Sequence, residues 1–332
     1  MPKERILFLD TARVVAMLWI VGFWHLRHYT GIGFSDNIVT FIGDDYITDI
    51  MLSVFMFLSG FFMSKYRFDD FWNDCKAFYW KRFTRFYLLY ATSAILLYGI
   101  GFNRGIFRLI TTLTLTSTFI LPQPQTLWFF SMLASFYVFT PFILKSPCKS
   151  LIINGLIVLS GGVILHLLLP KGIDTRFFWC FPLYTFGIYV GKRNEIMRWM
   201  TNDLVGVLSV ISLVLFFILL LNYSIVSDYL WFFILPLGII SVIYLSKYIS
   251  MLPIKSLIGV IAYASMCAYL FHREFYSILK RICVMSGITY SYWFCIIFFL
   301  PVCLFGSYFL QKYYDRYIVG KLLISKKESN GN

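Results

Sequence analysis

The sequence contains few charged residues for its length. Asp, Glu, Lys and Arg make up 14% of its 332 residues, whereas 59% are hydrophobic and 20% are aromatic. A soluble domain has about 25% charged residues, which cover its surface. Because this chain has too few, lipid must cover much of it, and a soluble protein is excluded. The length fits one domain of many helices over residues 1–332, without a large soluble appendage.

The sequence also lacks the pattern of a disulfide framework or a metal cluster. Its seven cysteines are scattered without a C-x-x-C pair, and several lie in apolar runs, as expected of small buried side chains. We therefore predict no metal. No cleavable signal is evident, because the first apolar run is long and has no small-x-small site at its end.

Apolar runs of membrane-spanning length recur along the chain. A helix needs about 20 residues to cross the hydrocarbon core of a bilayer. We predict an all-α, polytopic membrane protein with about ten transmembrane helices near residues 11–29, 46–64, 84–102, 126–144, 150–169, 177–191, 203–222, 229–246, 256–274 and 289–311. The Thr-rich run 106–122 ends in PQPQ and could be an eleventh crossing, a surface element or a re-entrant element.

The positions of lysine and arginine favour ten crossings. Cytoplasmic loops are enriched in both residues. With both termini in the cytoplasm, 21 of the 29 Lys and Arg residues fall on that side, whereas a crossing by 106–122 would put the basic tail, about 312–332, outside. We read 106–122 as an outer-face or re-entrant element. The net charge of +13 then reflects orientation and contact with anionic lipid, not nucleic acid.

Ionisable residues flank the first apolar run at both ends. Asp10 and Arg13 lie at one end, and His25, Arg27 and His28 lie at the other. Such residues inside a span are costly and mark a functional site by default. The i, i+3 spacing of Asp10 and Arg13 allows an ion pair on one helix face, which alone would be a structural explanation. His25 lies roughly 18 Å further along the helix axis.

Five motifs follow in order along the chain. They are LDTAR with a histidine on the first helix, FMFLSGFFMSKY (55–66), KRFTRF (81–86), LWFFSMLASFYVFTPFIL (127–144) and AYASMCAYLFHREFY (262–276). Each motif alone is weak, because apolar sequence matches easily. In this order, and with this helix count, essentially the whole chain resembles the membrane-bound acyltransferase-3 family, the O-acetyltransferases of bacterial surface polysaccharides.

The resemblance implies a reaction and a compartment. It implies a multi-pass protein of the bacterial inner (cytoplasmic) membrane, with acetyl-CoA as the cytoplasmic donor. It also implies an acceptor hydroxyl on a lipid-linked or extracytoplasmic glycan; the acyl group is acetyl or succinyl. Many members of the family carry a soluble periplasmic transferase domain after the last helix. The tail here is about twenty residues, so a separate partner would supply that domain, or the membrane domain would work alone.

The resemblance also implies roles for particular residues. The family places an arginine and a catalytic histidine on the first helix, which Arg13 and His25 match, with Asp10 beside them. It places an R-x-x-R pair at the cytoplasmic start of the third helix, which Arg82 and Arg85 match. A histidine can deprotonate a sugar hydroxyl or carry the acetyl group. Two arginines one turn apart can bind the phosphates of coenzyme A, although they could be ordinary cytoplasmic anchors.

One spacing departs from the family pattern. Eleven residues separate Arg13 from His25, where the family usually has ten. At about 100° per residue, a step of twelve lands about 120° away from the starting face, whereas a step of eleven returns within roughly 20° of it. A local π-bulge would restore the alignment. Otherwise His25 faces the cavity and Arg13 serves elsewhere, with His28 as a competitor one turn further out.

The remaining ionisable groups are less specific. His272 and Glu274, in LFHRE near the outer end of the ninth helix, could bind the acceptor or be structural, and His166 is read as structural. Ser59-Gly60 is read as small-residue packing between helices.

Two other functions stay open at this point. An exporter or flippase for a glycan or small acid would use the intramembrane charges to line a pathway. A non-catalytic subunit of a polysaccharide assembly complex would need no active residues.

Overall fold

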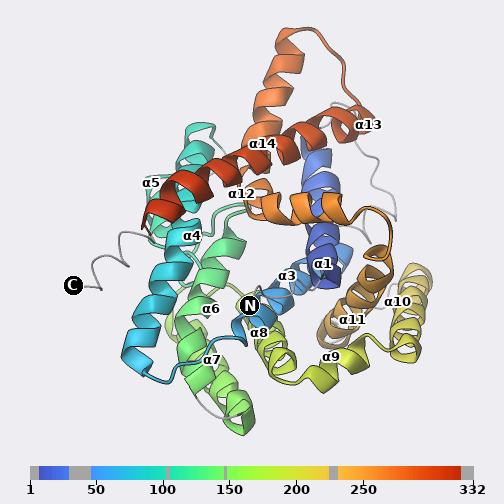
Figure 1. Cartoon of the computed structure of the whole chain (residues 1–332). Helices are drawn as coiled ribbons and strands as arrows, with labels where there is room; N and C mark the ends of the chain where they lie inside the picture. Colours follow the sequence, from blue (N-terminus) through green and yellow to red (C-terminus); the bar gives the residue numbers. More distant parts are fainter. Residues whose placement is uncertain (1–6, 30–45, 102–104, 146–147, 224–230, 323–332) are drawn as a thin grey trace.

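The computed structural model describes residues 7–29, 46–101, 105–145, 148–223 and 231–322, which form helices joined by turns, with no strand in these ranges (Figure 1). The elements are α1 (Leu7–Met17), the π-helix η1 (Leu18–His25), the 3-10 helix η2 (Leu26–Tyr29), α3 (Thr48–Met63), α4 (Phe71–Gly99), α5 (Ile106–Leu113), α6 (Trp128–Lys145), α7 (Cys148–Leu168), α8 (Phe177–Lys192), α9 (Asn194–Met200), α10 (Asp203–Tyr223), α11 (Trp231–Ile249), α12 (Lys255–Met285), α13 (Tyr292–Phe294), η5 (Cys295–Phe299), α14 (Leu300–Tyr314) and η6 (Asp315–Val319).

The all-α prediction is confirmed for the described residues. Each predicted segment overlaps a helix, and six helical stretches are long and apolar enough to cross a membrane. Two further apolar helices, Thr48–Met63 and Phe233–Ile249, are shorter. The count of about ten crossings and the cytoplasmic placement of both termini stay predictions.

The run 106–122 forms only one short helix. The eight residues of α5 rise about 12 Å, less than half of the hydrocarbon core of about 30 Å. Turns follow it as far as the start of α6. This local structure fits a surface or re-entrant element better than a crossing.

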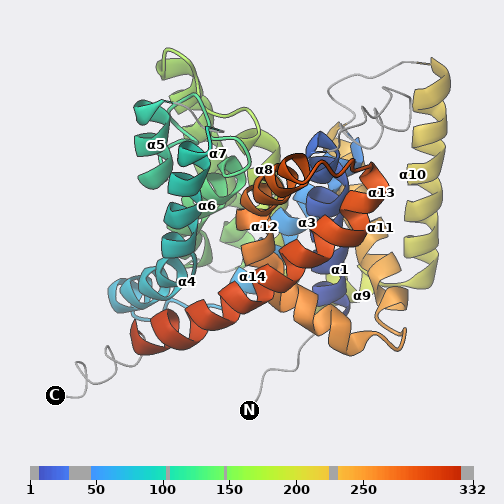
Figure 2. The same ribbon diagram turned by 90° about the horizontal axis from the view of Figure 1, so that it is seen from above.

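The helices differ sharply in how much of their apolar surface the protein itself covers. In the most hydrophobic window of α6, 78% of the residues are buried, whereas the corresponding windows of α7 and α10 are 22% and 17% buried. In Figure 2, α1 and α3 lie near the middle and α10 stands at the edge. Apolar faces left exposed on this scale require lipid around them.

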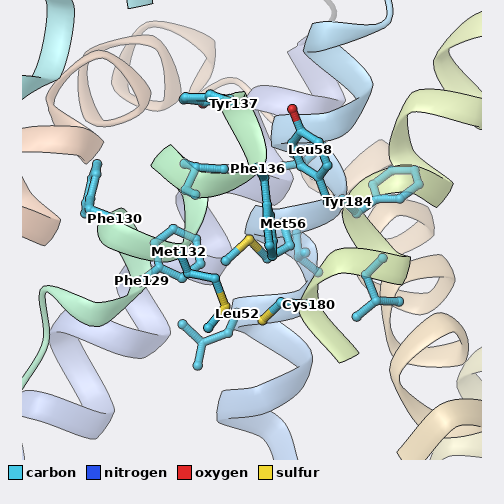
Figure 3. Close-up of a cluster of buried hydrophobic side chains, with 14 of the residues drawn as sticks. Leu52, Met56, Leu58, Phe129, Phe130, Met132, Phe136, Tyr137, Cys180 and Tyr184 are labelled. Atoms are coloured by element: carbon cyan, nitrogen blue, oxygen red, sulfur yellow. The ribbon is translucent and has the colours of Figure 1, made fainter. Parts of the chain in front are cut away.

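The core is packed where α3, α6 and α8 meet. Figure 3 shows Met56, Phe136 and Tyr184, one from each helix, converging there, and the rings of Phe136 and Tyr184 have centroids 5.3 Å apart. The α3 and α8 backbones approach closely at Gly60 and Gly187. A Cβ at Gly60 would collide with the carbonyl oxygen of Tyr184, which agrees with the predicted small-residue packing. This contact fixes α3, which carries one wall of the cavity described below.

Candidate active site

The first helix changes its winding between its two ionisable ends. It is α-helical over Leu7–Met17, π-helical over Leu18–His25 and 3-10 helical over Leu26–Tyr29. A π-turn takes up one residue more than an α-turn, and such insertions are frequent at functional sites. The π-helix required to compensate for the long Arg13–His25 spacing is therefore present. At Gly22, inside it, a Cβ would lie 2.9 Å from a methyl carbon of Leu300, so the absence of a side chain lets α14 pack close.

Four of the predicted site residues line one cavity. It has a volume of about 760 Å³ and receives Asp10 and Arg13 from α1 and Arg82 and Arg85 from α4. Residues of α3, α6, α12, α14 and η6 form the rest of its walls. The ion pair predicted from the i, i+3 spacing is confirmed, with Arg13 Nη1 3.9 Å from Asp10 Oδ1. Both residues of this ion pair line the cavity, so they can also contact a ligand there.

Aromatic rings contact the guanidinium groups of Arg13 and Arg82 in the cavity. The Arg13 guanidinium lies 5.1 Å from the ring centroid of Phe62. The Arg82 guanidinium lies 5.0 Å from the ring centroid of Tyr66, whose hydroxyl accepts a hydrogen bond from Arg82 Nη2 at 2.9 Å. Within the described part of the chain, Arg82 Nε is buried without a hydrogen-bond partner. The guanidinium thus has a fixed position and an unused donor, which suits an anionic ligand.

His25 and His272 form a stacked pair in the protein interior. Their ring centroids are 4.6 Å apart with an interplanar angle of 11°, and the residues are 2% and 0% exposed. The ring of Trp24 stacks on that of His25, with centroids 4.4 Å apart. Two imidazoles at this separation repel each other strongly if both are charged, because the surroundings have a low dielectric constant.

The hydrogen bonds of His272 orient its ring. Nδ1 lies 2.8 Å from the carbonyl oxygen of Tyr269 and 3.2 Å from that of Ala268, and carbonyl oxygens only accept. Nδ1 therefore carries a proton and donates it, which leaves the lone pair of a neutral ring on Nε2. Among the described residues, His272 Nε2 and His25 Nδ1 are buried with no partner. Buried unsatisfied nitrogens are unusual and point to a functional use.

Tyrosines connect this pair with the spaces on either side of it. The ring of Tyr269, which lines the cavity, lies 6.0 Å from His272, and the ring of Tyr276 lies 5.9 Å from His272 on the other side. Positions 269, 272 and 276 are spaced i, i+3, i+7 and share one face of α12. The motif AYASMCAYLFHREFY already contained this spacing, but of its residues only His272 and Glu274 were predicted to belong to the site.

Glu274 lies on a different face of α12 from its predicted companion His272. Its Oε1 accepts a hydrogen bond of 2.7 Å from Ser93 Oγ of α4. It lines a separate groove of about 370 Å³ between α4, α12 and α14. A step of two residues turns a helix by about 200°, so neighbours at this spacing cannot face one site.

The other two histidines stand apart from the stacked pair. His28, on η2, is exposed and lines a different pocket. His166 Nδ1 accepts a hydrogen bond of 3.1 Å from the backbone N–H of Ile173, which ties the end of α7 to the turn that follows it. This is the structural role predicted for His166. Of the competing histidines, His25 is the one that packs into the interior.

The sequence model of the acyltransferase-3 family, an acyltransferase domain, matches residues 6–312. The chain belongs to this family. It is therefore a membrane acyltransferase, and the resemblance drawn from the five motifs is confirmed. No curated protein and no solved structure matches the chain. In this acyltransferase, the matched region contains the first helix, the charged residues Asp10, Arg13, Arg82 and Arg85 of the cavity, and the stacked histidines.

Proposed function

We propose that this acyltransferase moves an acetyl or similar acyl group from acyl-CoA to a hydroxyl of a cell-surface or lipid-linked glycan in the bacterial cytoplasmic membrane. The observation that carries the proposal is the arrangement of two sites. Tyr269 lines the arginine-containing cavity, and its ring lies 6.0 Å from the ring of His272, which stacks on His25.

The cavity suits the coenzyme A part of the donor. Its volume of about 760 Å³ is of the size that encloses a cofactor-sized ligand. Arg82 and Arg85 offer planar donors to phosphate oxygens. The rings of Phe55, Phe129 and Phe130 lie toward Tyr269 and supply an apolar path for the pantetheine arm and the thioester.

The stacked histidines suit the transfer step. His25 takes the proton of the acceptor hydroxyl as its oxygen attacks the thioester carbonyl carbon. The tetrahedral intermediate carries an oxyanion that needs a hydrogen-bond donor or a positive charge. When the intermediate collapses, the C–S bond breaks, and the thiolate of coenzyme A receives the proton. His272 holds the His25 ring in plane and is a positioning residue.

The test is transfer of labelled acetyl groups from acetyl-CoA in membranes that contain the protein. The proposal expects label in the glycan or lipid fraction as a base-labile ester. No transfer, together with glycan export that still depends on the protein, would favour an exporter instead.

We expect Arg82→Ala to raise the KM for acetyl-CoA more than it lowers kcat. One charge-assisted hydrogen bond contributes about 1.5–3 kcal/mol, which corresponds to a roughly tenfold or larger change in KM. Arg67→Ala is the matched control, because this exposed arginine precedes α4 and does not line the cavity. Steady-state kinetics over a range of acetyl-CoA concentrations would show the difference. Equal KM values in the two variants would contradict a role for Arg82 in donor binding.

We expect His272→Phe to retain more activity than His272→Ala. Phenylalanine keeps a flat ring against His25, whereas alanine leaves the His25 ring without support on that side. The measurement is kcat and its pH profile at saturating acetyl-CoA. A pH profile that loses one limb in both variants would instead make His272 the proton-transferring group.

A further inference from the structure

A second pocket lies at the end of the first helix opposite Asp10 and Arg13. It has a volume of about 500 Å³ and is lined by His28 and Tyr29 of η2 and by Arg273, Lys280 and Arg281 of α12. None of these residues lines the arginine-rich cavity described above. The described residues therefore form two separate basic pockets, one at each end of the first helix.

The charge of this pocket is not balanced by the residues that line it. Among the described residues, three permanent cations line it and no carboxylate does. Within the ranges that the structure describes, Lys280 and Arg281 form neither an ion pair nor a hydrogen bond. Like charges brought together beside a membrane repel each other unless an anion binds between them. In the orientation favoured by the lysine and arginine count, these residues also face outward, where such residues are scarce.

The surroundings of the pocket are apolar. Ile100, Val284 and Met285 also line it, and Val284 and Met285 are 63% and 87% exposed. The 31 residues of α12 rise about 46 Å, so the helix is longer than the hydrocarbon core is thick. Its last turns project from the rest of the molecule at the top of Figure 1. Cations beside exposed apolar side chains fit an amphiphile with an anionic headgroup.

A short series of rings joins this pocket to the stacked histidines. The Tyr29 and Tyr276 rings have centroids 5.4 Å apart, and Tyr276 lies 5.9 Å from His272. Tyr29 OH also lies 3.4 Å from the carbonyl oxygen of Arg273, the residue that follows His272. A saccharide attached to a headgroup held here would extend toward the histidine pair along these two rings.

We propose that this pocket binds the diphosphate or phosphate headgroup of a lipid-linked saccharide and thereby presents a sugar hydroxyl to His25. Phosphate binding stands on the charge and shape of the pocket, whereas the identity of the ligand as the acceptor rests on the proposed acyl transfer. The hydrocarbon chain of the lipid lies along the exposed apolar side chains of α12. Arg281 and Lys280 contact the phosphate oxygens.

The binding experiment uses the full chain in detergent with farnesyl diphosphate as the probe. Excess coenzyme A occupies the other basic cavity throughout. We expect Arg281→Gln to weaken binding and the double variant Lys280→Gln/Arg281→Gln to weaken it at least about tenfold. The control is Arg198→Gln, which removes one exposed charge from α9 that lines neither pocket and should leave the Kd unchanged. Equal affinity of the wild type and the double variant would overturn the assignment.

Competition distinguishes the possible sources of the phosphate. Displacement of the probe by inorganic diphosphate at high concentration supports recognition of the headgroup. Displacement by phosphatidylglycerol at equal concentration would overturn the acceptor assignment and make the pocket a site for bulk anionic lipid. If the wild type binds the probe, the double variant does not, and the protein transfers no acyl group, the phosphate-binding assignment of the pocket would be supported and the proposed acyl transfer would be contradicted. If the double variant transfers acyl groups to a lipid-linked acceptor with an unchanged KM for that acceptor, the acyl transfer would be supported and the role of this pocket would be contradicted.

Discussion

Acyl transfer by the His25→Ala variant is expected to fall by about 10²- to 10⁴-fold, the usual contribution of a positioned general base. The physical reason is the environment of the ring. His25 is buried, its ring stacks on those of Trp24 and His272, and its Nδ1 has no partner among the described residues. His272 Nε2 keeps a lone pair, because its Nδ1 donates to backbone carbonyl oxygens, so activity that remains in His25→Ala would measure how far His272 can replace His25. Acetyl-CoA binding should persist, since Arg82 and Arg85 are untouched.

The matched control is His166→Asn. It changes a histidine that bonds to the backbone of Ile173, and asparagine retains an acceptor for that N–H. Activity is compared per amount of folded protein, with acetyl-CoA affinity measured on the same samples. Activity that survives in His25→Ala but is lost in His28→Ala would move the catalytic role to His28. Label that stays on the wild-type protein without an acceptor, and is absent from His25→Ala, would make His25 the carrier of the acetyl group instead of a base.

Composition was sufficient to predict the fold class, because a chain with so few charges cannot cover a water-facing surface. Helix boundaries were less accurate where polar residues continue a helix beyond its apolar run. The predicted helix at 84–102 begins at Phe71, and the one at 256–274 continues to Met285. Both extensions hold charged residues at intervals, and a window of hydrophobicity does not detect them.

The candidate site was only partly readable from the sequence. The spacing of Asp10 and Arg13 predicted their ion pair, and the extra residue before His25 made a π-turn one of two alternatives, because both inferences depend on the geometry of one helix. The stacking of His25 on His272 depends on how the two ends of the chain pack, and no local pattern specifies that contact. No local pattern specifies the second basic pocket either, because its residues come from both η2 and α12.

The Gly187→Leu variant is expected to lose most of its folded population. A Cβ at this position would collide with the carbonyl oxygen of Phe57 and lie 2.9 Å from the backbone nitrogen of Phe61. Backbone atoms of α3 cannot turn aside as a flexible side chain would, so the two helices must separate. Overpacking of a core costs about 1–3 kcal/mol even where side chains can adjust, and the cost here should exceed that range.

The measurement is thermal unfolding in detergent, followed by size-exclusion chromatography of the soluble fraction, with Gly161→Leu as the control. Gly161 lies on α7, and a Cβ there would meet no atom within 4 Å among the described residues. The added side chain would extend into lipid or detergent and should leave the unfolding temperature nearly unchanged. Because α3 contributes Phe55 and Ser59 to the cavity wall, any Gly187→Leu protein that still folds should also bind acetyl-CoA more weakly. Equal unfolding temperatures for the two variants would mean that α3 and α8 can move apart without cost, and the close glycine contact would then not be what holds this wall of the cavity in place.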